Sequence, residues 1–173
     1  MIIKRFYDDL YDFQETTHIR NTARALAKDE AGRFVFLRIQ GEDMFGKRDH
    51  LETCGGGMEE NETPEETLRR EVMEELGYRI KKAVPLGTII DEYHLIQRET
   101  HSHFFYCELD TSVHYTPQWT DLEKTLLKDA VHLSVEEALH ELEFHQVGKV
   151  GTIVQRRDLF ALRYLIEHFP DLV

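Results

Sequence analysis

The sequence predicts an α/β or α+β sandwich, and three observations support this fold class. Short apolar runs separated by polar or glycine-containing turns recur along the chain and are typical of strands. Three segments, 64–76, 134–142 and 154–169, carry helix-start signals or the apolar spacing of a helix. The strand-like and helix-like segments are interleaved, which favours a sheet with helices packed against it.

The first third of the chain predicts strands. Residues 2–14 mix aromatic and acidic side chains, so we expect either an edge strand or a homodimer contact within an N-terminal extension, 1–17. Segments 22–28 and 33–40 are apolar and predict a hairpin that turns near Gly32. Segment 40–49 is polar and predicts a loop, followed by a short strand, 50–53, that enters a glycine-rich turn.

The rest of the chain continues the alternation. Segments 80–96, 101–109 and 130–133 predict strands, and the polar segment 110–128 predicts a long loop. A capping-box pattern opens the helix at 134–142, and Pro170 ends the amphipathic helix at 154–169. We therefore expect one domain over residues 1–173, with 150–173 as its C-terminal helix.

Composition excludes several classes of function. The 173 residues include 21 basic and 33 acidic side chains, giving a net charge of −12, and no cluster of Lys and Arg. Long nucleic acid is therefore a poor partner, because binding its backbone requires clustered cations. No run approaches the roughly 20 apolar residues of a membrane span. The two cysteines, Cys54 and Cys107, fit a reducing cytoplasm without a disulfide framework.

Three glycines, 55–57, precede the most informative helix. Thr63 and Glu66 predict a capping box, Pro64 occupies the first helical position, and Gly77 supplies the stop. The glycines give a backbone that can approach a ligand closely. This combination predicts a well-defined helix directly after a glycine-rich turn.

The helix carries three carboxylates, Glu71, Glu74 and Glu75, at spacings of three and four that place them on one face within a single turn. Acidic helix faces are usually solvated surfaces. Here, however, the carboxylates lie beside an apolar stripe that must face a core, so they lie where the helix meets a pocket. Oxygen ligands of this kind suit Mg²⁺, which commonly bridges carboxylates to substrate phosphates. The stripe consists of Leu68, Val72 and Leu76.

Segment 56–78 resembles the signature of the Nudix hydrolases, G-x5-E-x7-R-E-U-x-E-E-x-G-U, where U is a bulky apolar residue. Tyr78 replaces the usual aliphatic residue at the last position, and Cys54 stands where many members carry a proline. The matching positions are Gly56, Glu62, Arg70, Glu71, Val72, Glu74, Glu75, Gly77 and Tyr78.

The resemblance implies a mixed sheet between helices, an αβα sandwich, and hydrolysis of a nucleoside diphosphate linked to another moiety. It also implies Mg²⁺ or Mn²⁺ as cofactor and roles for particular residues. The metal would be held by Glu71, Glu74, Glu75 and the backbone of Gly56, while Arg70 and Glu62 hold Glu71 in place. The general base would be a glutamate of the signature or an acid of the late loop. That loop offers Asp121, Glu123 and Asp129, of which we favour Glu123.

Two other functions fit the same fold. An isopentenyl diphosphate isomerase-like enzyme would use a cysteine at the position of Cys54, but that branch lacks the full glutamate set. A non-catalytic Nudix-like module would bind a nucleotide, but such modules commonly lose glutamates that are all present here. Arg20, Arg24 and Arg38 could reach a phosphate, although surface pairing with the abundant acids is the simpler role.

Overall fold

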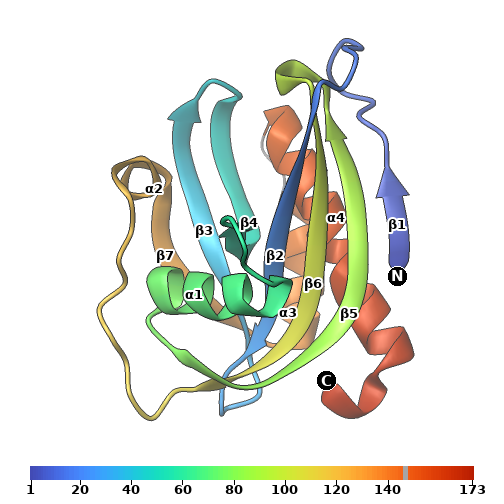
Figure 1. Ribbon diagram of the computed structural model, residues 1–173. Helices are drawn as coiled ribbons and strands as arrows, with labels where there is room; N and C mark the ends of the chain where they lie inside the picture. The colour runs from blue at the N-terminus through green and yellow to red at the C-terminus, as the bar shows by residue number, and fades with distance from the viewer. Residues whose placement is uncertain (146–147) are drawn as a thin grey trace.

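The computed structural model describes residues 1–145 and 148–173, and a seven-stranded mixed sheet forms its centre (Figure 1). The predicted sandwich class is confirmed. The strands are β1 (Ile2–Phe6), β2 (His18–Lys28), β3 (Phe34–Asp43), β4 (Gly46–Gly57), β5 (Arg79–Tyr93), β6 (Arg98–Asp110) and β7 (Leu127–Leu133).

The sheet has the strand order β1-β5-β6-β2-β4-β3-β7. The β1–β5 and β2–β6 pairs are parallel, whereas β5–β6, β2–β4, β3–β4 and β3–β7 are antiparallel. The N-terminal extension therefore supplies an edge strand, as one of its two predicted roles required. Whether it also contacts a second copy of the chain stays a prediction.

Helices cover both faces of the sheet (Figure 1). One buried cluster joins α1 to the alanines of β2, and a second joins α3 and α4 to the opposite face through side chains such as Leu26 and Phe104. None of the helices in the described ranges is long and apolar enough to cross a membrane. The helices are α1 (Pro64–Leu76), α2 (Asp121–Leu126), α3 (Val135–Phe144) and α4 (Gly148–His168), and two 3₁₀ turns span His94–Ile96 and Pro170–Leu172.

Both ends of α1 form as predicted. The Thr63 side chain accepts a hydrogen bond from the Glu66 N–H, and the Glu66 side chain accepts one from the Thr63 N–H. Gly77 ends the helix in the left-handed conformation, with φ of 71°. Local capping chemistry therefore sets both ends of the helix.

The loop after β6 fixes the C-terminal end of α1 in place. The Tyr115 N–H donates to the Gly77 carbonyl, and the Gln118 N–H donates to the Glu74 carbonyl at 2.7 Å. The Trp119 indole donates to the Glu75 carbonyl at 3.0 Å. These bonds satisfy carbonyl groups that a helix end leaves without intrahelical partners, so the turn that carries Glu74 and Glu75 is held by a distant segment.

Five details of the sequence prediction were wrong. The strand predicted over 80–96 ends at Tyr93, where a 3₁₀ turn follows. Segment 40–49 is not a loop, because β3 and β4 pair as far as Asp43 and Gly46. The long loop 110–128 contains α2, whose capping box at Thr120 and Glu123 has the same pattern as that of α1. Helix α4 begins at Gly148 because its buried face extends back through Val150 and Ile153. The glycines 55–57 end β4 rather than forming a turn.

The glycine end of β4 is the part that joins it to β2. Only four residue pairs connect the two strands, Thr22–Ala25 with Cys54–Gly57. The rest of β4, from Gly46 to Thr53, pairs with β3. The β3–β4 hairpin therefore diverges from β2 and β6, as the ribbon shows (Figure 1), and the cavities described below lie between these two parts of the sheet.

Candidate functional site

The end of β4 and helix α1 together position the predicted carboxylates. Glu71 and Glu75 point toward β4 and are only 7% and 8% exposed, whereas the Glu74 side chain is 40% exposed. The Gly55 N–H donates to Glu75 Oε2 at 2.8 Å. Two carboxylates are thus buried against the glycine strand, and the third lies at the rim.

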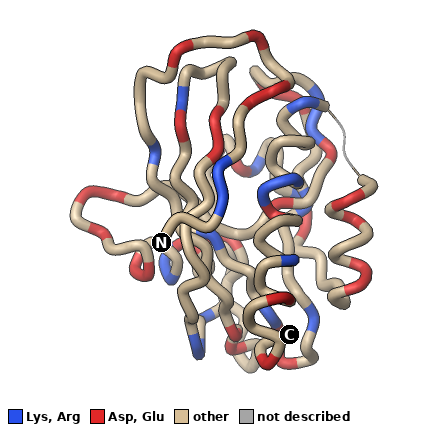
Figure 2. Tube along the Cα trace, turned by 90° about the vertical axis from the view of Figure 1, so that its right-hand side faces the viewer, with Lys and Arg blue, Asp and Glu red and all other residues tan. Residues whose placement is uncertain are grey.

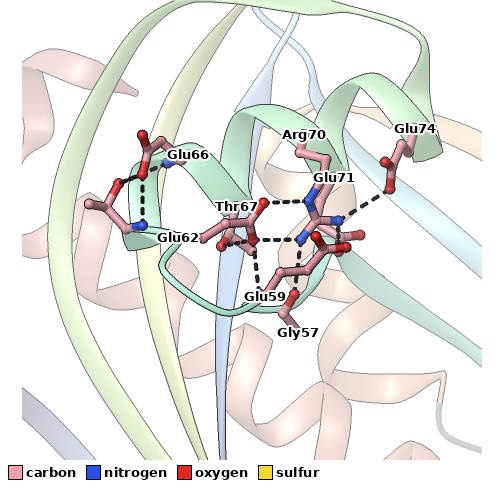
Figure 3. A network of polar contacts seen from close by, with 9 residues as sticks. Gly57, Glu59, Glu62, Glu66, Thr67, Arg70, Glu71 and Glu74 are labelled. Atoms are coloured by element: carbon pink, nitrogen blue, oxygen red, sulfur yellow. Dashed lines mark hydrogen bonds and ion pairs between the residues drawn. The ribbon is translucent and has the colours of Figure 1, made fainter.

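Arg70 connects four acidic or carbonyl groups (Figure 3). Its guanidinium donates to both oxygens of Glu62, at 2.7 and 2.8 Å, to Glu71 Oε1 at 2.7 Å and to the Gly57 carbonyl at 3.0 Å. It also lies 3.3 Å from Glu74 Oε2. Bidentate contact with Glu62 fixes the plane of the guanidinium, which in turn fixes Glu71.

Glu62 is itself held by the loop before α1 and by the first turn of that helix. The Glu59 N–H donates to its Oε2 at 2.9 Å, and the Thr67 hydroxyl donates to the same oxygen at 2.7 Å. Hydrogen bonds from Arg70 and these groups lower the pKa of Glu62, so it stays ionised. A chain of charged contacts therefore runs from Glu62 through Arg70 to Glu71.

The glycines of β4 are required by close packing. A Cβ atom at Gly56 would lie 2.5 Å from Glu71 Oε1. A Cβ at Gly55, where φ is +141°, would lie 2.0 Å from the Ala23 carbonyl oxygen. The absence of side chains lets the Glu71 carboxylate rest directly on the strand backbone, and it lets that backbone pair with β2.

Burial raises the free-energy cost of ionising these carboxylates. Desolvation raises the pKa of Glu75 to about 8, against the lowering effects of Cys54 and the Gly55 N–H. Desolvation also raises the pKa of Glu71, although Arg70 opposes it. Both negative charges are costly in this position. A divalent cation would relieve that cost.

The donor set fits a hard divalent cation, although no three His, Cys, Asp or Glu side chains of the described ranges already converge as a closed metal site. The hydrogen bonds from Arg70 and the Gly55 N–H each use one oxygen of a carboxylate. Mg²⁺ prefers oxygen ligands, and it is usually bound by one or two carboxylates together with substrate phosphates rather than by a complete protein cage. Two buried carboxylates with a third at the rim match that preference.

A cavity of about 240 Å³ lies against Glu75 and Gly55. Glu123 lines it as well, so α2 brings the favoured general base to the same cavity as Glu75. The Glu123 carboxylate accepts a hydrogen bond from the Thr120 N–H at 2.6 Å, which caps α2. Asp121 and Asp129 are exposed instead. The role of Glu123 as general base stays a prediction.

Comparison with known proteins gives a family. The model of the NUDIX domain matches residues 18–152, most of the chain. The chain belongs to the Nudix family. A search of curated proteins finds no match.

Solved structures share the Nudix fold at low sequence identity. A MutT protein from Methanosarcina mazei Go1 superimposes with a TM-score of 0.62 at 18% identity, covering 91% of this chain and 99% of that one. A NUDIX hydrolase from Nitrosomonas europaea gives 0.61 at 17%, covering 83% and 90%. A MutT NUDIX hydrolase from Burkholderia pseudomallei gives 0.57 at 14%, covering 70% and 87%. At these identities the likeness establishes the fold.

The three arginines considered from the sequence of this Nudix protein have different surroundings. Arg38 lies 3.5 Å from Asp49 and from Glu141, which is the surface pairing expected as the simpler role. Arg24 also pairs with an acid, Glu52, at 2.7 Å, but both side chains are largely buried and line the cavities rather than the surface. Arg20 has no carboxylate within ion-pair distance among the residues that the structure describes. Its guanidinium lies beside Gly57, where a Cβ would be 3.0 Å from Arg20 Nη2.

Sequence reasoning missed the second, larger cavity of this Nudix fold. It has a volume of about 490 Å³ and shares Arg20, Arg24 and Glu52 with the cavity at Glu75. Arg98, from β6, was not a candidate because nothing in its local sequence distinguishes it. The only available signal was two-residue alternation in β2, which places Arg20, Thr22 and Arg24 on one face.

Replacing Glu62 tests the chain of contacts that orients Glu71. We expect Glu62→Gln to raise the Mg²⁺ concentration needed for half-maximal activity about 10- to 100-fold, because a ligand that loses its orienting partner binds metal less well. Glu60→Gln is the matched control, because Glu60 is exposed and this substitution removes the same charge two residues away. An unchanged Mg²⁺ requirement in Glu62→Gln would contradict the positioning role.

Proposed function

We propose that this Nudix protein is a metal-dependent pyrophosphohydrolase that cleaves a nucleoside diphosphate linked to another moiety. The observation that carries the proposal is the pair of buried carboxylates, Glu71 and Glu75, packed on the glycine end of β4 beside a cavity. A bound Mg²⁺ or Mn²⁺ would withdraw charge from the diphosphate and lower the pKa of the attacking water.

The residues of the chain would divide the remaining work. Glu71, Glu74, Glu75 and the Gly56 backbone would hold the cation, and Arg70 with Glu62 would orient Glu71. Glu123 faces the same cavity as Glu75 and would accept a proton from water once its contact with the Thr120 N–H is exchanged.

The isomerase alternative is disfavoured by the surroundings of Cys54. The thiol is completely buried, and its Sγ lies 3.7 Å from the Glu71 carbonyl oxygen. Burial and the neighbouring Glu75 raise the pKa of Cys54 well above its ordinary value. Reactive cysteines have lowered pKa values and partial exposure, so Cys54 has the character of a structural thiol.

The test is a screen of nucleoside diphosphate derivatives with Mg²⁺, read as release of a nucleoside monophosphate in ¹⁸O-labelled water. We expect cleavage that stops in excess EDTA and label in a phosphate product, because water attacks phosphorus. Binding of these compounds without any cleavage would favour the non-catalytic alternative. Cleavage that persists in EDTA would contradict the metal dependence.

A further inference from the structure

The 490 Å³ cavity is rich in arginine although the chain as a whole carries a charge of −12. Five arginines and two carboxylates line it. Elsewhere, acidic and basic positions are interspersed along the trace (Figure 2). The basic residues of the cavity are Arg20, Arg24, Arg48, Arg98 and Arg157.

Three of these arginines already face carboxylates. Arg24 lies 2.7 Å from Glu52, Arg48 lies 2.7 Å from Asp43, and Arg157 lies 2.7 Å from Asp158. Arg20 and Arg98 differ, because no ion pair joins either of them to a carboxylate within the described part of the chain. Two guanidinium groups of the cavity are therefore left without an acidic partner.

The side chain of Arg98 is oriented by two neighbouring residues. Its Nε donates to the Thr100 hydroxyl at 3.2 Å, and its guanidinium lies 5.2 Å from the centre of the Tyr93 ring. The pKa of Arg98 is lowered by burial and then by the nearby positive charge of Arg20. The two cations thus repel each other in the absence of an anion, and a shared anion would offset that repulsion.

A fully buried arginine forms part of the wall behind these two groups. Arg157 is 1% exposed and lines the cavity, yet its Nη2 makes no hydrogen bond and lies 3.5 Å from Glu52 Oε1. Its charge is therefore balanced mainly by the closer Asp158, and Arg157 forms a fixed part of the cavity wall rather than a free donor. Arg24 Nε, on the same cavity, is unpaired as well.

We propose that this arginine cavity binds a phosphate group of the substrate that lies outside the bond to be cleaved. The inference rests on the proposed function for the identity of the substrate, but the binding of phosphate does not depend on it. Guanidinium groups match phosphate oxygens in charge and geometry. The extra phosphate is either a dianionic monoester on the nucleoside sugar or a further, singly charged member of a longer phosphate chain, and both present anionic non-bridging oxygens that guanidinium groups bind.

The position of Arg20 connects this cavity to the carboxylates. Arg20 also lines the cavity at Glu75, and its guanidinium lies beside Gly57, whose carbonyl accepts a hydrogen bond from Arg70. A substrate whose diphosphate lies at the carboxylates would therefore extend past Arg20 into the larger cavity. A volume of about 490 Å³ falls in the range of small-molecule sites.

Matched substrate pairs test the proposal and separate the two sources of phosphate. NADP⁺ against NAD⁺ adds one sugar phosphate, and diadenosine tetraphosphate against diadenosine diphosphate lengthens the chain. We expect the native protein to prefer the phosphate-rich member of one pair about 10-fold or more in kcat/KM. Arg20→Gln and Arg98→Gln should each reduce that preference about 10-fold, whereas Arg163→Gln, at an exposed ion pair on α4, should keep it.

A second measurement does not need turnover. Calorimetric binding of inorganic tripolyphosphate in EDTA should weaken about 10-fold in Arg20→Gln and in Arg98→Gln, but not in Arg163→Gln. Arginine-dependent binding without cleavage of any compound would contradict the proposed function but would still support the phosphate site. Cleavage with no preference in either pair, or tripolyphosphate binding that both variants retain, would overturn the phosphate site alone.

Discussion

We expect Glu71→Gln and Glu75→Gln each to lower Mg²⁺-dependent kcat by about 10³-fold, since removing a metal ligand forfeits several kcal/mol of transition-state stabilisation. We expect this loss of activity without a loss of stability, for an electrostatic reason. Burial raises the pKa of Glu75 to about 8 and raises that of Glu71 as well. A neutral glutamine of the same shape should therefore be tolerated at either position in the metal-free protein.

The measurement pairs steady-state hydrolysis with thermal unfolding in EDTA. The melting temperature of both variants should stay equal to or above that of the native protein, while activity is lost. Glu65→Gln is the matched control on the same helix, because Glu65 contacts Arg69 at the exposed surface. Activity close to native in either Glu71→Gln or Glu75→Gln would show that the replaced carboxylate is not a required metal ligand.

The second large effect concerns Gly55 and stability rather than chemistry. We expect Gly55→Ala to reduce the free energy of unfolding by roughly 3–5 kcal/mol, because it combines an unfavourable φ of +141° with a Cβ placed 2.0 Å from the Ala23 carbonyl oxygen. The backbone of β2 and β4 would have to separate where only four residue pairs join these strands.

Gly46→Ala is the control for backbone strain alone. Gly46 has a φ of +90°, but a Cβ there would meet nothing within 4 Å. We expect a loss of only about 1 kcal/mol. Chemical denaturation of both variants measures the difference. Equal losses at the two positions would show that close packing of β2 on β4 contributes little.

The parts of the fold that the sequence predicted are those set by local chemistry. The ends of α1 depend on Thr63, Glu66 and Gly77, which act on residues within four positions of themselves. The same capping pattern was present at Thr120 and Glu123, but a six-residue helix has no room for an apolar stripe, and α2 was missed. The β3–β4 hairpin was missed beyond Gln40 because its exposed strands are polar on both faces.

The candidate site divides in the same way. Glu71, Glu74 and Glu75 share one helix, so their proximity follows from helix geometry alone. The arginines of the cavity come from β2, β4, β6 and α4, and Arg20 and Arg98 become neighbours through the parallel pairing of β2 with β6. Arg20 and Arg98 are 78 positions apart in the numbering, and no local pattern connects them. That is why the metal-binding candidates were predictable and the proposed phosphate site was not.

The most direct test of the metal site is a titration of the metal-free protein with Mn²⁺, followed by electron paramagnetic resonance of the free ion. We expect the native protein and Glu65→Gln to bind Mn²⁺ and so reduce the signal of the free ion, and Glu71→Gln and Glu75→Gln to bind it at least about 10-fold more weakly. Native protein that leaves the Mn²⁺ signal unchanged, or variants that bind as tightly as the native chain, would contradict the claim that these carboxylates hold the ion.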